Sequence, residues 1–264
     1  MTFQRRRLID GGHVLVATPL ERMGVVAAFS ERTGGRSRSP FDSLNVSFSV
    51  GDDLADVRAN RRTIATGLGI GPFACAGLVH GSSIALVGPD RAGAGYDDPN
   101  GVVAGADGLA TRTSGLPLAI TSADCLPLVL ASSSEPTVVV VHAGWRGLAS
   151  GILARAVAVF ERTIDVVVAV GPAIGPDHYE VGADVVDAVA RAPFSRLVAR
   201  RVGDRFALDL VETARATLAR AGVGDVSDTG LCTACERARF FSHRADGGRT
   251  GRQVAIAVRA AGTG

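Results

Sequence analysis

Cys125 and His142 each follow an apolar run at the point where a strand would end. Cys125 comes after LAITSAD, and His142 comes after TVVVV. A thiolate and an imidazole at the edge of a buried sheet can serve as metal ligands, or as a nucleophile and its base. The stretch over residues 120–147 therefore predicts an enzyme, and both chemistries remain open from these two residues alone.

His80 extends this pair. It ends the apolar run FACAGLVH and precedes a glycine, and only it and His142 combine an apolar run before them with a small residue after them. With Cys125 they would form a three-ligand set, which on zinc leaves a fourth position for water or substrate. The alternative is that both histidines are satisfied residues at the edge of the core and that Cys125 is a small hydrophobe.

Five further residues are candidates for a role near this set. Asp124 is adjacent to Cys125 and could act as a general acid or base, or else it is a turn residue. Arg146 stands at the predicted start of a helix, where an anion would bind favourably, although a surface salt bridge is an equal alternative. Arg32 and Asn45 lie in a long Gly- and Ser-rich loop, and Arg244 lies in an arginine-rich one. Such loops often carry binding groups, but many are only solvated surface.

Cys232 and Cys235 form a CxxC pair, which could be half of a structural zinc site or a redox pair. There is no second CxxC in the chain, so the simpler interpretation is two cysteines in a turn. Asp107 is predicted to be a turn residue. Tyr179 could line the pocket, although a packing role is the simpler interpretation.

Composition predicts one large domain over residues 1–264 with many buried strands, because 47% of the residues are hydrophobic and 33 are glycine. Strands are predicted over residues 13–18, 25–30 and 73–80. A helix is predicted to open at residues 51–53, with an Asp as its N-cap, and to end near Gly69; one amphipathic helix is predicted over residues 148–163.

Charge and residue usage exclude several classes of protein. The formal net charge is only +2 with no basic tract, so nucleic-acid binding is not expected. All 28 basic side chains are arginine, which excludes a lysine Schiff base or a P-loop lysine. No apolar run approaches the about 20 residues of a membrane helix. With four cysteines and no visible leader, a cytoplasmic protein is expected.

Several motifs together resemble the YfiH family of laccase-domain proteins. They are HG at residues 80–81, SADCLPL at 122–128, VHAGWRG at 141–147, GPAIGPDHYEV at 171–181 and FFSHRADGGRTGRQ at 240–253. The resemblance implies an α+β fold layered α/β/β/α, with mixed β-sheets flanked by helices, and metal ligands at His80, Cys125 and His142. Leu78 stands where the family usually has Gln, and Ala173 where it often has Cys.

The resemblance implies one of two activities: copper-dependent polyphenol oxidation, or zinc-dependent phosphorolysis of adenosine, inosine, guanosine and methylthioadenosine with adenosine deamination. A laccase needs many histidines and commonly an axial Met, whereas this chain has five His and only Met1 and Met23. We therefore expect zinc rather than copper, with purine nucleoside and phosphate as small-molecule partners, in a monomer.

Roles follow from that expectation as hypotheses. Asp124 would carry a proton for deamination, while Arg146 and Arg32 would hold phosphate. Two other classes remain open: a hydrolase or deamidase that uses Cys125 with His142, and a non-catalytic regulator associated with the cell envelope.

Overall fold

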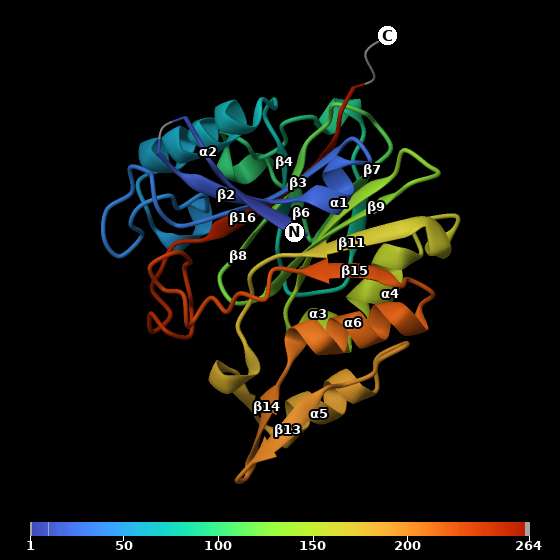
Figure 1. The fold of residues 1–264 in the computed structure, drawn as a ribbon. Helices are drawn as coiled ribbons and strands as arrows, with labels where there is room; N and C mark the ends of the chain where they lie inside the picture. Colours follow the sequence, from blue (N-terminus) through green and yellow to red (C-terminus); the bar gives the residue numbers. More distant parts are fainter. Residues whose placement is uncertain (1, 10, 262–264) are drawn as a thin grey trace.

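Two β-sheets stacked face to face form the centre of the molecule (Figure 1). The computed structural model describes residues 2–9 and 11–261. The first sheet has seven strands in the order β1 (Phe3–Arg7), β2 (His13–Ala17), β3 (Val25–Ser30), β16 (Gln253–Arg259), β8 (Leu118–Ser122), β4 (Ala74–Gly77) and β6 (Val103–Ala104). The second has six, in the order β15 (Asp225–Asp228), β11 (Val166–Val170), β9 (Leu126–Ser132), β10 (Val138–Ala143), β7 (Gly108–Thr111) and β5 (Ile84–Leu86).

Strand β10 explains why the central stretch of the sequence is continuously apolar. Side chains alternate between the two faces of a strand. Val138 and Val140 pack into the core between the two sheets, whereas Val139 and Val141 pack into the core beneath the helices. Because both faces are covered, all four positions are apolar, and no alternation is visible in the sequence.

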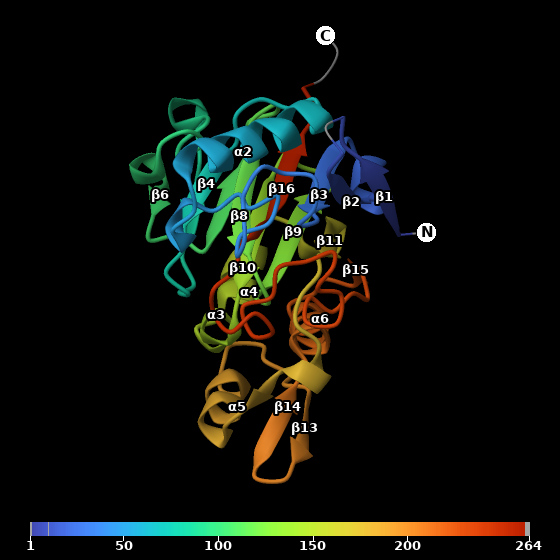
Figure 2. The same ribbon diagram turned by 90° about the vertical axis from the view of Figure 1, so that its left-hand side faces the viewer.

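Helices cover the outer face of each sheet (Figure 2). Helix α2 (Leu54–Leu68) packs on the seven-stranded sheet; Asp53 caps its first amides and Gly69 ends it in the left-handed region, as predicted. The short α1 (Thr18–Glu21) contacts β3 and β11. The remaining helices are α3 (Trp145–Ala149), α4 (Ile152–Val157), α5 (Ala183–Ala190) and α6 (Leu210–Arg220), which contribute to the core outside the six-stranded sheet. The predicted α+β fold with helix-flanked mixed sheets is confirmed.

A smaller sheet extends the molecule at one end, beside α5 (Figure 1). Its strands are β12 (Glu180–Val181), β14 (Arg205–Leu208) and β13 (Ala199–Val202). Short 3-10 turns occur at η1 (Phe48–Val50), η2 (Pro89–Arg91), η3 (Pro99–Gly101), η4 (Thr163–Asp165) and η5 (Pro176–His178). That residues 1–264 form one domain stays a prediction.

Two element predictions need correction. The helix predicted over residues 148–163 is wrong as a single element, because Gly151 has φ 77° and separates α3 from α4. A left-handed residue cannot continue a right-handed helix. The strand predicted over residues 73–80 is shorter, since β4 ends at Gly77 and His80 has φ 59°. The chain therefore turns before His80 rather than at it.

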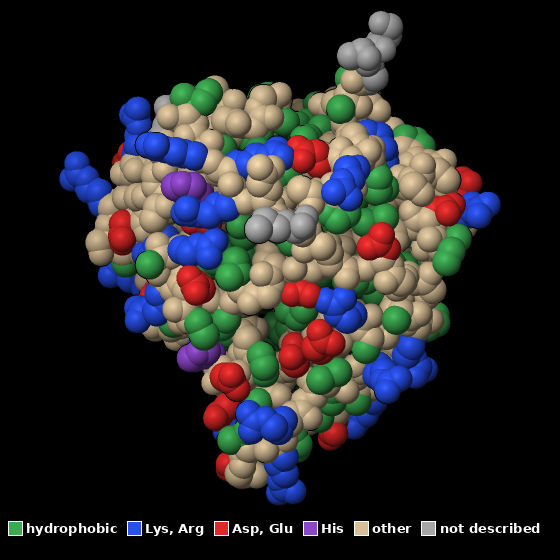
Figure 3. All heavy atoms as spheres, in the orientation of Figure 1, with side chains coloured by type: hydrophobic (Ala, Val, Ile, Leu, Met, Phe, Trp, Pro, Cys, Tyr) green, Lys and Arg blue, Asp and Glu red, His purple; other side chains and the backbone are tan. Residues whose placement is uncertain are grey.

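Basic and acidic side chains are interspersed on the surface. On the face drawn in Figure 3, arginine side chains stand in separate groups with acidic side chains between them. Among residues 2–9 and 11–261, no helix is long and apolar enough to cross a membrane.

Candidate metal centre

His80, Cys125 and His142 meet at one end of the stacked sheets; we call them the first cluster. Cys125 lies in the link from β8 in one sheet to β9 in the other, and His142 lies in β10. Their ligand atoms all lie within 4.8 Å of one another. The two imidazole rings are nearly perpendicular, with centroids 5.0 Å apart. The structure thus brings together the three residues that the sequence singled out.

Asp107 holds the two histidines of this cluster in place. Its Oδ1 lies 3.1 Å from Nδ1 of His142 and accepts a hydrogen bond from the amide of His80 at 2.8 Å. Its Oδ2 accepts from the amides of Gly81 and Val79. A carboxylate on Nδ1 leaves Nε2 of His142 as the free ring nitrogen, the usual arrangement of a metal-ligating histidine.

Burial and hydrogen bonds shift the pKa values of Asp107 and Cys125 in opposite directions. Burial alone would raise the pKa of Asp107, but hydrogen bonds from His142, Gly81 and Val79 lower it to about 2. Burial also raises the pKa of the Cys125 thiol, yet hydrogen bonds with His142 and His80 outweigh it and lower the pKa to about 6. These groups therefore carry negative charge at neutral pH.

His142 carries the matching positive charge. Burial lowers its pKa, but the hydrogen bonds with Asp107 and Cys125 raise it to about 9. In the absence of a metal the site is a thiolate–imidazolium pair, and a bound cation would displace that proton.

The first cluster opens into a cavity of about 400 Å³, called here the main cavity. Arg146 stacks on Trp145 at 4.4 Å, and Arg244 lies 5.3 Å from the ring of Tyr179. Guanidinium groups are therefore available to an anion beside the cluster. The lining residues are Ser49, Leu78, His80, Thr121, Ser122, Ala123, Asp124, Cys125, His142, Gly144, Trp145, Arg146, Ile174, Tyr179, His243, Arg244 and Arg252.

Asp124 lines the main cavity, but its oxygens already bind other loops. Oδ1 accepts from the hydroxyl of Thr233 at 2.6 Å, and Oδ2 accepts from the amide of Arg244 at 2.7 Å. Asp124 also has φ 91°, which only a firmly held non-glycine residue adopts. Its carboxylate fixes the two loops that border the cavity.

Arg32 and Asn45 are not brought to the main cavity. Arg32 packs over the ring of Phe241 and donates to the carbonyls of Asp42 and Arg237. The Asn45 side chain is buried and accepts from the amide of Arg252 at 2.9 Å. Both residues hold loops behind the site, whereas Arg146 and Arg244 face it.

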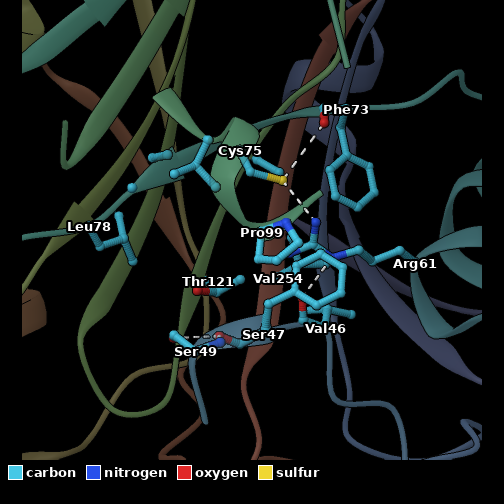
Figure 4. A pocket seen from close by; sticks show the side chains of 15 residues that line it. Val46, Ser47, Ser49, Arg61, Phe73, Cys75, Leu78, Pro99, Thr121 and Val254 are labelled. Carbon is cyan, nitrogen blue, oxygen red and sulfur yellow. Dashed lines mark hydrogen bonds between the residues drawn. The ribbon is translucent and has the colours of Figure 1, made fainter. Parts of the chain in front are cut away.

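An inner cavity of about 250 Å³ borders the main one. The two cavities share Ser49, Leu78 and Thr121, which lie to one side of the inner cavity with Arg61 on the other (Figure 4). Arg61 is buried and donates to the carbonyls of Val46, Gly95 and Tyr96, so its guanidinium is already hydrogen-bonded within the protein. The inner cavity is mainly an apolar space next to the first cluster.

Sequence reasoning missed several residues of this site. Asp107 was expected to be only a turn residue and Arg252 had no assigned role, yet Asp107 binds His142 and Arg252 lines the main cavity. Tyr179, for which packing was favoured over a place in the pocket, also lines it. Pairing of β7 with β10, Gly108 opposite Val141, places Asp107 next to His142. Knowledge of that register would have found Asp107.

Comparison with known proteins agrees with the motifs and the geometry. The family model described as multi-copper polyphenol oxidoreductase laccase matches residues 26–260. The "Purine nucleoside phosphorylase YlmD" of Geobacillus stearothermophilus is 41% identical over 245 residues, covering 88% of this chain and 89% of that protein. The "Purine nucleoside phosphorylase YfiH" of Escherichia coli is 35% identical over 239 residues, covering 84% and 89%.

Solved structures extend this likeness to the whole fold. The crystal structure of YlmD from Geobacillus stearothermophilus superposes with a TM-score of 0.92 at 38% identity, covering 98% of this chain and 99% of that one. Bacillus licheniformis YfiH gives a TM-score of 0.89 at 31% identity, covering 97% and 98%.

Fold and site together define an α+β protein whose Cys–His₂ cluster can hold a metal ion. The chain belongs to the YfiH family of laccase-domain proteins.

The donor set of the first cluster fits a zinc ion. One thiolate and two imidazoles suit zinc, and the Asp107–His142 contact supplies the supporting carboxylate. A blue-copper centre would commonly add an axial methionine. Met23 instead packs against the core between the sheets, and Met1 lies outside the described residues.

Proposed function

We propose that this protein cleaves purine nucleosides by phosphorolysis in the main cavity. The observation that carries the proposal is the first cluster, a Cys–His₂ donor set, at a cavity bordered by arginines, in a chain whose relatives are named purine nucleoside phosphorylases. In this reaction a phosphate oxygen bonds to C1′ of the ribose as the C1′–N9 bond breaks. The products are the free base and ribose 1-phosphate.

His80, Cys125 and His142 would hold zinc, which when bound supplies a Lewis acid beside the reacting atoms. Arg146 and Arg244 would attract and orient phosphate. The pKa of Tyr179 is raised to about 12, chiefly by burial, so its hydroxyl keeps its proton at neutral pH and can donate a hydrogen bond to the departing base. The apolar inner cavity would take the base or a 5′ substituent out of water.

The finer details belong to the same proposal: zinc as the metal, adenosine, inosine, guanosine and methylthioadenosine as substrates, a monomeric protein, and a cytoplasmic location. The geometry gives Asp124 less support as a proton carrier than as an anchor for Thr233 and Arg244. Adenosine deamination would then need a proton carrier other than Asp124.

A substrate assay on metal-analysed protein tests the function. We expect inosine and adenosine to release base only when phosphate is present, with ribose 1-phosphate formed in equal amount. Removal of the metal with a chelator should stop the reaction, and zinc should restore it. Base release independent of phosphate would contradict phosphorolysis.

A second candidate function rests on the thiolate–imidazolium pair of Cys125 and His142, which is also the arrangement of a cysteine hydrolase. The two proposals separate under chelation. A hydrolase would keep its activity in the chelator and lose it when Cys125 is alkylated in the metal-free protein. Copper-loaded protein that oxidised phenols at the rate of a laccase would favour the oxidase instead.

A further inference from the structure

His178, Cys232 and Cys235 form a second cluster, outside the main cavity. His178 lies on η5, and the cysteines lie in the turn after β15. His178 Nε2 is 3.2 Å from Cys235 Sγ, although the two residues are 57 positions apart in the chain. The ligand atoms of all three residues lie within 4.8 Å of one another. The fold has therefore supplied the third donor that the CxxC pair lacked in the sequence.

We propose that the second cluster is a separate zinc-binding site of the Cys₂His type. Zinc prefers thiolate and imidazole donors at about 2.3 and 2.0 Å, which in a tetrahedral site places the donors themselves about 3.5 to 3.8 Å apart. The side chains would need only small rotations to reach this geometry, because His178 Nε2 and Cys235 Sγ are 3.2 Å apart and all three donor atoms lie within 4.8 Å of one another. His178 and Cys235 are exposed, so solvent can supply the fourth ligand.

The backbone around Cys232 is shaped to its sulfur atom. The amide of Gly175 donates to Cys232 Sγ at 3.1 Å, and a Cβ on Gly175 would come within 3.3 Å of that sulfur. Hydrogen bonds of this kind orient the ligands of a metal site. Thr233 then donates its amide to the carbonyl of Ala173 at 3.0 Å, which joins the two loops in register.

A cation can also reach the second cluster from solvent. The second cluster lies at a cavity of about 280 Å³, here the acidic cavity, whose lining includes four carboxylates and no arginine. The acidic cavity gives a cation a route to the donors, although Arg215 pairs with Glu212 and Asp228, and Arg200 pairs with Asp177. The four carboxylates are Asp177, Asp209, Glu212 and Asp228.

Metal at this site would join two loops that border the main cavity. His178 precedes Tyr179, which lines that cavity, and Cys232 precedes Thr233, which binds Asp124. The second zinc would therefore act as a clamp and not as a reaction partner. This role does not depend on which reaction the main cavity performs.

Cobalt titration of the metal-stripped, reduced protein tests the site without any substrate. Wild-type protein should bind two cobalt ions, with three thiolates contributing to the thiolate-to-cobalt absorption band: one from the first cluster and two from the second. Cys235→Ser should reduce the stoichiometry to one and remove about two thirds of the band, whereas Cys125→Ser should remove about one third. Cys75→Ala, at a buried cysteine outside both clusters, is the matched control and should keep both ions.

His178→Asn is a second, independent variant. It should keep the fold because His178 is exposed, and should weaken cobalt binding at the second cluster at least about tenfold. One cobalt ion per wild-type chain, or an unchanged band in Cys235→Ser, would overturn the proposal. So would a Cys232–Cys235 disulfide whose reduction adds no metal binding.

Discussion

The two Cys/His clusters use similar donors in opposite surroundings. The first cluster has one thiolate and two imidazoles, a buried His142 held by Asp107, and a cavity bordered by arginines. The second has two thiolates and one imidazole, and a cavity bordered by carboxylates; within residues 2–9 and 11–261, no carboxylate binds its imidazole. The first is therefore suited to bind an anion next to a metal, and the second to bind a metal alone.

This difference shows that the types of the donor atoms alone do not define the role of a metal site. A catalytic metal site keeps an open position next to a substrate cavity, while a structural one mainly ties segments together. The arginines around the first cluster can bind an anionic substrate next to the open position of the metal. The second cluster lies between two loops that a bound metal would hold together. Variants of the two clusters that had equal effects on activity would contradict this difference in role.

The largest contrast is expected between Cys125→Ser and Cys235→Ser. Loss of the Cys125 thiolate should lower kcat/KM for phosphorolysis by about 10³-fold or more, because the Lewis acid contributes several kcal/mol. Cys235→Ser should lower it by no more than about tenfold, through looser positioning of Tyr179. Steady-state rates with inosine and phosphate measure both; equal losses would mean that the clusters form one functional unit.

Asp107→Asn is expected to have the next largest effect. The amide can still contact His142 but no longer supplies negative charge on Nδ1, so zinc affinity and kcat/KM should fall by about 10- to 100-fold. Competition with a chromogenic chelator measures the affinity. Asp204→Asn, at an exposed turn position, is the control and should change neither. A normal zinc affinity in Asp107→Asn would show that the carboxylate only supports the turn at residues 79–81.

Asp107 also shows where sequence reasoning ends. The apolar runs before His80, Cys125 and His142 indicated strands, and strands that end at one edge of a sheet bring such residues together. The Asp107–His142 contact depends on the register between β7 and β10, which no local pattern reveals. The layers of the fold were predicted from the resemblance to the YfiH family, because family motifs carry information about strand pairing that periodicity lacks.

The second cluster escaped prediction for a related reason. A CxxC pair without a second CxxC or partners at zinc-finger spacing looked incomplete, and His178 stands 57 residues before Cys235. The two segments meet because Ala173 and Cys232 form an isolated parallel bridge. Likewise Gly151, a residue type common in this chain, gave no sign that it divides the predicted helix into α3 and α4.

Thiol reactivity should distinguish the clusters in metal-stripped, reduced protein. The pKa of Cys125 is lowered to about 6, so its thiolate is present above that pH; the pKa of Cys235 is raised, first by its hydrogen bond with Cys232. Iodoacetamide labelling at pH 7 should therefore be at least about tenfold faster at Cys125, although Cys235 is more exposed. Peptide mass spectrometry over pH 5 to 10 should show the Cys125 rate level off above about pH 7. A Cys125 rate that still rises near pH 9 would contradict the thiolate–imidazolium pair.

Arg146→Ala should have the smallest effect, because the guanidinium is exposed and its attraction is screened by solvent. We expect the KM for phosphate to rise roughly tenfold at low salt, with little change in kcat or in zinc content, since the arginine contacts the anion and not the metal. The difference from wild type should shrink as salt is added. Arg191→Ala, at the exposed end of α5, is the matched control and should leave the KM for phosphate unchanged. If instead the KM for nucleoside rises and that for phosphate does not, Arg146 contacts the nucleoside, and the phosphate lies toward Arg244 and Arg252.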